Sequence, residues 1–416
     1  MTAPAVALTG RRHLSAGEIE MVVSAHERFL SGKPGGRRAN LRFIDLTGVD
    51  LSGRDLSDAD LSSSILDGAK LAGCKLERAN LFGSDLRKAD LRRANLRRAD
   101  LRGCCLRGAD LTEADLTQAD FRIGQIAVPH PSKGLSSLVH HARPGQLDHA
   151  VFTGASLDGS QFNEASMFAV DLTDCSLRGA KLSRANLKEA CLEGAILDGA
   201  DVGGANLENA NLTDAILTGV DLGTARISGA NLSGSMAAPS AAAIARAEDV
   251  FSMAEANQAW CRGQPGRPAK LDGEDLRPLD QRLRGFRLSA MSARGACFVG
   301  MDLSGVHLQG ANLEGADLRG VVLAGADLRG AKLAGANLTK ADLREAVLGP
   351  LPLGADRSAP GSLEHARLRY ALATGADLSG AVLDGADLRG CDFTGANMRG
   401  VSLRDTDPTV AIGLPG

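Results

Sequence analysis

Large apolar residues recur every five positions along most of the chain. With the central residue of each five taken as position i, one run extends from Leu41 to Phe121 without a slip, and a second from Phe152 to Leu232. A third run covers Leu283 to Leu348 and a fourth Leu363 to Leu403, and these two share a phase. Position i−2 is mostly Ala or another small residue, i−1 is mostly Asp or Asn, and i+2 is often Gly.

A period of five matches neither an α-helix, which repeats every 3.6 residues, nor a strand, which repeats every two. It matches a chain that turns a corner every five residues, so that the side chains at i and i−2 both face inward. Asp or Asn at i−1 can bond the local backbone, and Gly at i+2 tolerates a positive φ. Four such sides close a coil, and stacked coils pair their backbones about 4.8 Å apart. The pattern therefore predicts an all-β solenoid.

The triplets Ala89-Asp90-Leu91, Ala94-Asn95-Leu96 and Ala99-Asp100-Leu101 follow the pattern A-[DN]-L-x-x. This pattern resembles that of the pentapeptide-repeat family, and it covers about two thirds of the chain. The resemblance implies a right-handed quadrilateral β-helix. It also implies a class of function, because some members of that family are similar to duplex DNA in shape and charge, bind DNA gyrase, and protect it from quinolones or inhibit it.

Two segments outside the repeats indicate an internal duplication. Residues 26–46, "HERFLSGKPGGRRANLRFIDL", are similar to residues 257–276, "NQAWCRGQPGRPAKLDGEDL". Each segment contains the end of a predicted helix, then G-x-P-G, then a first repeat unit, and Phe29 matches Trp260. We therefore expect two solenoid cassettes, each preceded by a helix.

The predicted helices have a physical reason to lie at the start of each solenoid. A capping box of Ser15 and Glu18 begins the first helix, and the second spans about 240–262. Because the open end of a β-helix exposes unpaired strand edges, we expect each helix to cap the first coil of its own solenoid. The predicted domains are residues 1–236 and 237–416.

Two insertions interrupt the repeats. Residues 122–151 separate the two runs of the first domain, shift the phase by one, and hold four of the eight histidines, including His140 and His141. Long insertions often carry function, so we take these two histidines as candidate contacts and expect an exposed or partly helical loop. Their spacing matches no metal-ligand pattern. The insertion at 349–362 keeps the phase, which predicts a loop extruded from a continuous stack.

Charge is unevenly distributed, although the whole chain carries only −3. Residues 86–107 hold eight basic residues against two acids, and residues 189–221 hold seven acids and no base. We expect a basic belt near the middle of the first rod and an acidic collar at its far end. Either the outward positions carry charge for solubility, or the two patches orient a protein partner. Under the second interpretation the candidate partner-binding residues are Arg92, Arg93, Arg97, Arg98, Glu193, Asp198, Asp201 and Glu208.

No catalytic, cofactor or metal site is predicted. The sequence lacks a Walker motif, an H-E-x-x-H helix, a G-x-S-x-G elbow and a C-x-x-C pair, and several cysteines stand at i−2, where a small core residue belongs. The start has no secretory pattern and no window reaches the length of a membrane span, so we expect a cytoplasmic protein without membrane contact.

The leading hypothesis is a non-catalytic protein-binding scaffold with an unidentified protein partner. The alternative, which rests on the resemblance, is a DNA-mimicking regulator or protector of DNA gyrase or topoisomerase. Direct nucleic-acid binding by the belt is not favoured. A phosphate-binding patch needs its cations on one side, whereas consecutive pentapeptides face successive sides of the square.

Overall fold

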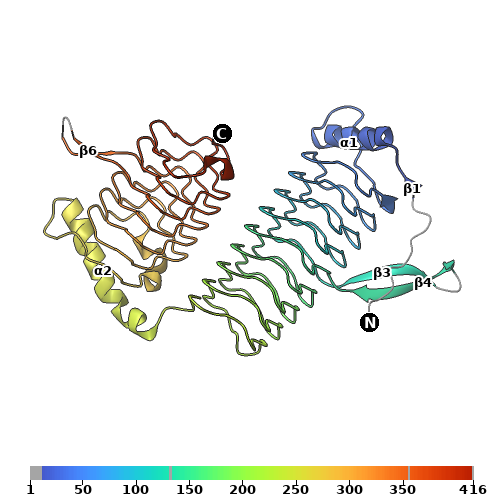
Figure 1. Cartoon of the computed structure of the whole chain (residues 1–416), viewed down its shortest axis with the longest axis horizontal. Helices are drawn as coiled ribbons and strands as arrows, with labels where there is room; N and C mark the ends of the chain where they lie inside the picture. The colour runs from blue at the N-terminus through green and yellow to red at the C-terminus, as the bar shows by residue number, and fades with distance from the viewer. Residues whose placement is uncertain (1–11, 131–133, 355–356, 415–416) are drawn as a thin grey trace. The chain divides into compact units, whose positions relative to one another are not determined.

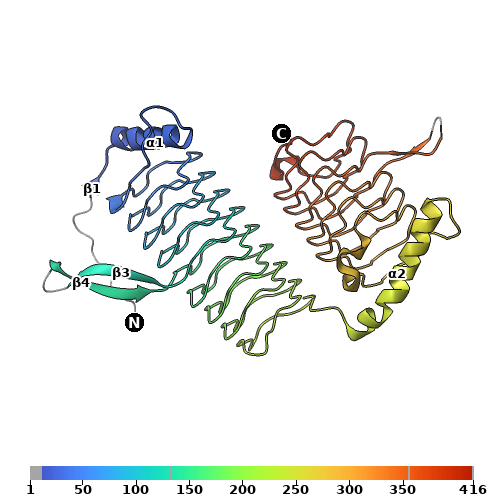
Figure 2. The same cartoon turned by 180° about the vertical axis from the view of Figure 1, so that it is seen from behind.

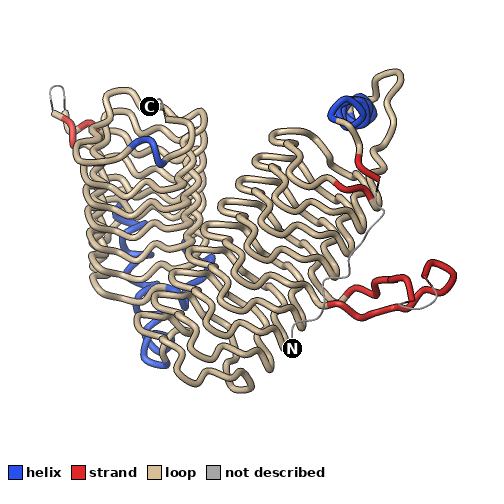
Figure 3. The backbone as a smooth tube through the Cα atoms, turned by 45° about the vertical axis from the view of Figure 1, so that its right-hand side comes forward, coloured by secondary structure: helices blue, strands red, loops and turns tan. Residues whose placement is uncertain are grey.

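The structure is a computed structural model and describes residues 12–130, 134–354 and 357–414. The chain divides into two compact units, Met1–Ala238 and Pro239–Gly416 (Figure 1). In each unit the backbone winds into stacked coils, drawn in tan in Figure 3. Residues at i−1 form parallel β-bridges with their counterparts one coil away. Each unit is thus a β-helix.

Four ladders of bridges run along each unit, one for each side of the coil. In the first unit one ladder joins Asn40, Asp60, Asn80 and Asp100. The other three ladders begin at Asp45, Asp50 and Asp55. Each side contributes a single bridged residue before the chain turns again, which accounts for the period of five.

Few regular elements lie outside the coils of the described residues. The first unit has β1 (Arg12–His13), α1 (Ala16–Leu30), β2 (Ile44–Asp45), β3 (Gly124–His130) and β4 (Gly134–Arg143). The second has α2 (Ala241–Cys261), η1 (Arg277–Leu283), β5 (Leu351–Pro352), β6 (Ser358–Ala359) and η2 (Pro408–Val410). β1 pairs parallel to β2 beside the first coil.

The core of each coil is filled by the residues at i and i−2. Leu91 and Leu96, both at i, and Ala89 and Ala94, both at i−2, are buried. Four cysteines replace alanine at i−2 and are buried as the sequence predicts: Cys74, Cys104, Cys175 and Cys391. Burial disfavours the thiolate and raises the pKa of Cys74 to about 12, so these thiols act as small core residues.

The polar positions of the repeat shape its corners as predicted. The carboxylate of Asp90 accepts the backbone N–H of Arg92 at 3.2 Å, and the amide oxygen of Asn95 accepts that of Arg97 at 3.1 Å. Position i+2 adopts a positive φ, for example 66° at Gly103. Both features bend the chain locally, which is why they could be read from sequence.

The long insertion is an antiparallel hairpin, not the exposed or partly helical loop that we expected. β3 pairs with β4 in a register that sets Gln125 opposite Ala142 (Figure 2). The expected range of 122–151 was also too wide, because β4 ends at Arg143 and Leu147 already occupies a buried i position. The coils continue without a break, since Cys105 bridges Gln146.

The short insertion in the second unit also leaves the stack continuous. Lys332 bridges Ser362 directly, and the residues between them include the small antiparallel pair β5 and β6. The insertion lengthens this coil by as many residues as two sides contain, so the five-residue phase is unchanged across it.

Helix α1 lies over the first coil of the first unit (Figure 1). It begins with the predicted capping box, in which the Ser15 hydroxyl accepts the N–H of Glu18 and the Glu18 carboxylate accepts that of Ser15. His26 is fully buried between helix and coil. Its Nδ1 accepts the N–H of Ala39 at 3.1 Å, so Nε2 carries the proton and donates to the carbonyl of Ser57 at 2.9 Å.

Helix α2 contacts the first coil of the second unit in the same way. Asn257 is fully buried; its Oδ1 accepts the N–H of Ala269 at 2.9 Å and its Nδ2 donates to the carbonyl of Ser289 at 3.1 Å. An amide therefore makes in one unit the pair of backbone bonds that an imidazole makes in the other.

Candidate interaction surfaces

The basic belt encircles the first unit. Asp90, Asn95, Asp100 and Cys105 belong to four different ladders, so the arginines that follow them occupy four different corners. These arginines are Arg92, Arg97, Arg102 and Arg107. The belt therefore presents its cations in all directions around the rod.

Neighbouring coils and corners supply partners for most of these cations. Arg92 pairs with Asp90 at 2.7 Å, and this bond holds the pKa of the Asp90 carboxyl below its usual range. Arg93 pairs with Glu113 at 2.5 Å and Arg97 with Asp115 at 3.1 Å, in each case from the next coil.

Arg98 donates to the side-chain amide oxygen of Gln118 at 2.8 Å, so all four candidate arginines of the belt have side-chain partners. The charge excess that the linear sequence shows is thus partly offset in the folded rod. Exposed pairs of this kind contribute about 0–1 kcal/mol each, so they organise the surface more than they stabilise it.

The acidic candidates are likewise spread around the rod. Glu193 and Asp198 are exposed, and each follows a different ladder. Asp201 accepts hydrogen bonds from the Ser183 hydroxyl at 2.6 Å and the Gly203 N–H at 3.0 Å, which lower the pKa of its carboxyl. Glu208 lies 3.9 Å from Lys188.

A shallow depression of about 270 Å³ lies on the side of the rod that carries Asp201. Asp221 also lines it, together with Gly199, Gly203 and Thr224. In the ranges that the structure describes, no group of three or more His, Cys, Asp or Glu side chains is placed to hold a metal ion.

The histidine candidates lie on the hairpin. His140 and His141 are adjacent in β4, and His141 is exposed; the side chain of His140 lies outside the described part of the structure. The hairpin leaves the coil beside Phe82 and Arg102, because a Cβ at Gly124 would lie about 3 Å from both residues. The structure therefore brings the hairpin next to the belt, but it does not gather belt, collar and histidines into one site.

Sequence reasoning missed a line of basic residues on one edge of the second unit. One ladder joins Asn337, Arg367 and Asp387. Lys340, Arg369, Tyr370 and Arg389 lie at the corner that follows it. Successive residues of this line are separated in the chain by one coil, which is 20 residues, or 30 where the short insertion intervenes. Their alignment can be recognised only when the sequence is compared at these spacings.

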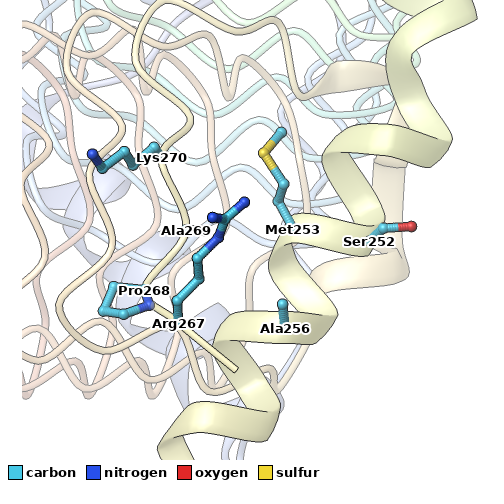
Figure 4. Close-up of a pocket in the computed structure, with 7 residues that line it drawn as sticks. All are labelled: Ser252, Met253, Ala256, Arg267, Pro268, Ala269 and Lys270. Atoms are coloured by element: carbon cyan, nitrogen blue, oxygen red, sulfur yellow. The ribbon is translucent and has the colours of Figure 1, made fainter. Parts of the chain in front are cut away.

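A groove of about 460 Å³ lies between α2 and the segment that follows it (Figure 4). Met253 and Ala256 line it from the helix, and Arg267, Pro268 and Lys270 from the opposite side. Its lining combines basic and apolar groups, and the side chain of Ser252, which also borders it, points away from Arg267 and Lys270. No helix in the described part of the chain is long and apolar enough to cross a bilayer.

A family model described as pentapeptide repeats matches the sequence eight times, and together the matches cover more than half of the chain. They span residues 39–78, 74–112, 94–122, 146–184, 165–204, 195–234, 311–349 and 362–407. No curated protein matches the sequence.

Several solved structures are similar to the chain. HetL, a pentapeptide repeat protein involved in heterocyst differentiation regulation in Nostoc sp. strain PCC 7120, is 24% identical, with 96% of this chain and 98% of HetL covered and a TM-score of 0.13. QnrB1, a plasmid-mediated fluoroquinolone resistance protein, is 20% identical over 47% of this chain and 92% of its own, with a TM-score of 0.26. A pentapeptide repeat protein of the Arabidopsis thaliana thylakoid lumen is 29% identical over 28% and 72%, with a TM-score of 0.13.

Proposed function

The chain belongs to the pentapeptide-repeat family, whose fold is a right-handed β-helix, and on that basis we propose that it is a non-catalytic protein-binding scaffold. The observation that carries the proposal is the fixed position of the backbone beside each corner. The backbone N–H of Leu91 donates to the backbone carbonyl of Asp110 in the next coil, and that of Asp90 donates to the carbonyl of Ala69 in the previous coil. The backbone beside each corner is therefore held from both sides. Rigid solenoids of this kind suit recognition of extended protein surfaces.

We also propose that the chain contains two cassettes, residues 1–236 and 237–416, each capped by its own helix. The matching bonds of His26 and Asn257 support a common origin. So do Gly36 and Gly266, where a Cβ would collide with the backbone of α1 or α2. A helix packed this closely protects the strand edges of the first coil from unwanted pairing.

The hairpin and the belt form the proposed contact surface of the first cassette. The hairpin is the one long departure from the regular sides of this cassette within the described residues, and its base adjoins Arg102. A regular rod offers similar faces to many partners, so an irregular projection beside fixed charges can supply specificity.

The eight free cysteines fit a reducing compartment, and we infer a cytoplasmic location.

Affinity capture of the full-length chain from native lysate, with and without nuclease, tests this function. The scaffold function predicts stoichiometric protein partners that persist after nuclease treatment. If repeated captures return no specific protein, the proposal is wrong.

A second candidate function is regulation or protection of DNA gyrase or topoisomerase through DNA mimicry. The acidic collar favours it, because Glu193 and Asp198 are exposed and neither forms an ion pair within the described ranges. The belt argues against it, since a DNA mimic presents negative charge along its whole length. If the added protein neither changes the supercoiling activity of DNA gyrase nor restores that activity in the presence of a quinolone, this candidate is eliminated.

A further inference from the structure

The groove beside the first coil of the second unit combines an apolar wall with two cations. It measures about 460 Å³ and lies between α2 and the segment that follows it (Figure 4), within the range of roughly 300–1,000 Å³ typical of ligand sites. Met253, Ala256 and Pro268 supply apolar groups, and Arg267 and Lys270 supply positive charge. None of the residues that line it is acidic. The groove therefore favours an occupant with an aliphatic group beside an anion.

One wall of the groove reflects a sequence difference between the two units. Counted back from the first leucine of each solenoid, Leu41 or Leu271, Pro268 corresponds to Arg38. In the first unit the Nε of Arg38 donates to the carbonyl of Asp58 in the next coil at 2.5 Å. Proline has neither the length nor the donor for this bond. The second unit thus presents a short apolar group where the first presents a bonded guanidinium group.

The two cations of the groove are available to a ligand. Arg267 and Lys270 are exposed, and neither side chain forms a hydrogen bond or a close ion pair among the residues that the structure describes. The exposed acids Asp249 and Glu255 belong to α2 but do not line the groove. Glu274 pairs with an arginine of α2 at 2.5 Å. The carboxylates of this region therefore leave both cations without a bound partner.

One carboxylate near the groove offsets part of this charge. Asp272 accepts from the Ser292 hydroxyl at 2.6 Å and from the N–H of Arg294 at 2.8 Å. These bonds, with smaller contributions from the charges of Arg294 and Lys270, lower the pKa of its carboxyl. Lys270 is thus partly neutralised, and Arg267 is the main cation of the groove.

The backbone of Lys270 adds a donor and an acceptor. One coil later, the N–H of Ser292 donates to the carbonyl of Ala269 at 2.9 Å, and the carbonyl of Ser292 accepts from Leu271 at 2.6 Å. Lys270 holds the same position in the first coil, which has no coil before it, and its N–H and C=O form no hydrogen bond within the described ranges. Both groups therefore face the side of the coil on which α2 and the groove lie.

We propose that this groove binds the C-terminus of a protein partner whose last residue is large and aliphatic. The proposal rests on the protein-binding function and names the chemistry of one partner. The terminal carboxylate pairs with the guanidinium group of Arg267, and the aliphatic side chain packs on Met253, Ala256 and Pro268. The N–H and C=O of Lys270 pair with the peptide backbone, as in strand addition to a sheet edge. A fatty acid lacks such backbone groups, so this edge favours a peptide.

The direct test is binding of a peptide with the sequence Gly-Gly-Ser-Leu, labelled at its N-terminus, to the full-length chain by fluorescence anisotropy. Converting the terminal carboxylate to a carboxamide is expected to weaken binding at least about tenfold, because a charged hydrogen bond is lost. Replacing the terminal leucine by glycine is expected to weaken it at least about tenfold, because the aliphatic contact is lost. Decanoate, added as a competitor, distinguishes a fatty acid from a peptide.

Two variants assign the binding to this groove. Arg267→Gln is expected to weaken binding at least about tenfold, whereas Arg37→Gln, at the corresponding position of the first unit, leaves it unchanged. Pro268→Arg installs the residue of the first unit. It adds a positive charge, yet it is expected to weaken binding at least about tenfold because it removes part of the apolar wall. Thermal melts check that each variant is folded.

Stronger binding in Pro268→Arg would show a general charge effect and overturn the proposal. So would equal loss in the Arg267 and Arg37 variants, equal binding of the carboxamide, or displacement by decanoate at a lower concentration than by unlabelled peptide. Absence of peptide binding at about 1 mM, with protein partners still captured after nuclease treatment, would overturn this proposal and leave the scaffold function standing.

Discussion

The tether between α1 and the first coil gives the sharpest prediction for stability. Replacing His26 by Ala leaves the buried N–H of Ala39 and the part-buried carbonyl of Ser57 without their partners. The unsatisfied N–H of buried Ala39 costs about 1–3 kcal/mol, the part-buried carbonyl of Ser57, which water can reach, costs about 1 kcal/mol, and lost packing adds about 1 kcal/mol. The expected destabilisation of the first coil is therefore about 3–5 kcal/mol.

The second unit suggests the matched control, because Asn257 makes the equivalent bonds. His26→Asn keeps a donor and an acceptor in place, so we expect it to recover most of the loss. Hydrogen exchange is the suitable assay, since it reports the opening of α1 and the first coil separately from the rest of a two-unit chain.

In His26→Ala the amides of α1 and the first coil should exchange at least about 100-fold faster, while those around Asn257 stay unchanged. Unchanged protection in His26→Ala would refute the reasoning. An Asn variant as damaged as the Ala variant would refute the proposed equivalence of the two tethers.

Three further predictions concern the repeat and the cap. Lys88→Gly should raise the free energy of unfolding by about 0.5–1 kcal/mol in urea denaturation, because residue 88 holds a φ of 53° that glycine adopts without strain; a loss of stability would contradict this account of i+2. Cys74 should resist maleimide at pH 8 until the chain unfolds, because its buried thiol has a pKa of about 12; rapid labelling of the folded protein would show that this core position opens. Arg54 lowers the pKa of Glu20 to about 2, so the contribution of this pair is present above the unfolded pKa of about 4.5 and is lost as the pH falls toward 2. The protection factors of the α1 amides, which correct for the intrinsic slowing of exchange at low pH, should therefore decrease over that range, and Arg54→Met should remove most of this decrease.

The regular part of the fold follows from the sequence because its causes are local. Each cause acts within one side of the coil: the core is filled by a leucine at i and an alanine at i−2. At i−1, the side chain of a residue such as Asp90 or Asn95 accepts the backbone N–H two residues later. The same holds for the capping box of Ser15 and Glu18. Such features repeat often enough for a single sequence to reveal them.

The features that the sequence did not reveal depend on contacts across coils. Arg93 finds Glu113 only after the coil length is known, which is why the belt seemed more basic than it is. The line of basic residues that includes Arg367 can be recognised only when both the coil length and the size of the short insertion before Arg367 are known. The hairpin was missed because Pro129 in β3 and the adjacent His140 and His141 in β4 obscure the alternation of these strands. The role of His26 was missed because its partners are backbone atoms.

The most direct test of the scaffold function uses two deletions that preserve the solenoid. Removing residues 123–143 takes out the hairpin and restores the 20-residue spacing across it, and removing residues 350–359 does the same for the short insertion. Capture of protein partners is then compared among the intact chain and both deletions, after nuclease treatment and after folding is checked by thermal melts. The account predicts that the first deletion loses partners that the intact chain and the second deletion retain. Retention of every partner by the chain without its hairpin would contradict it.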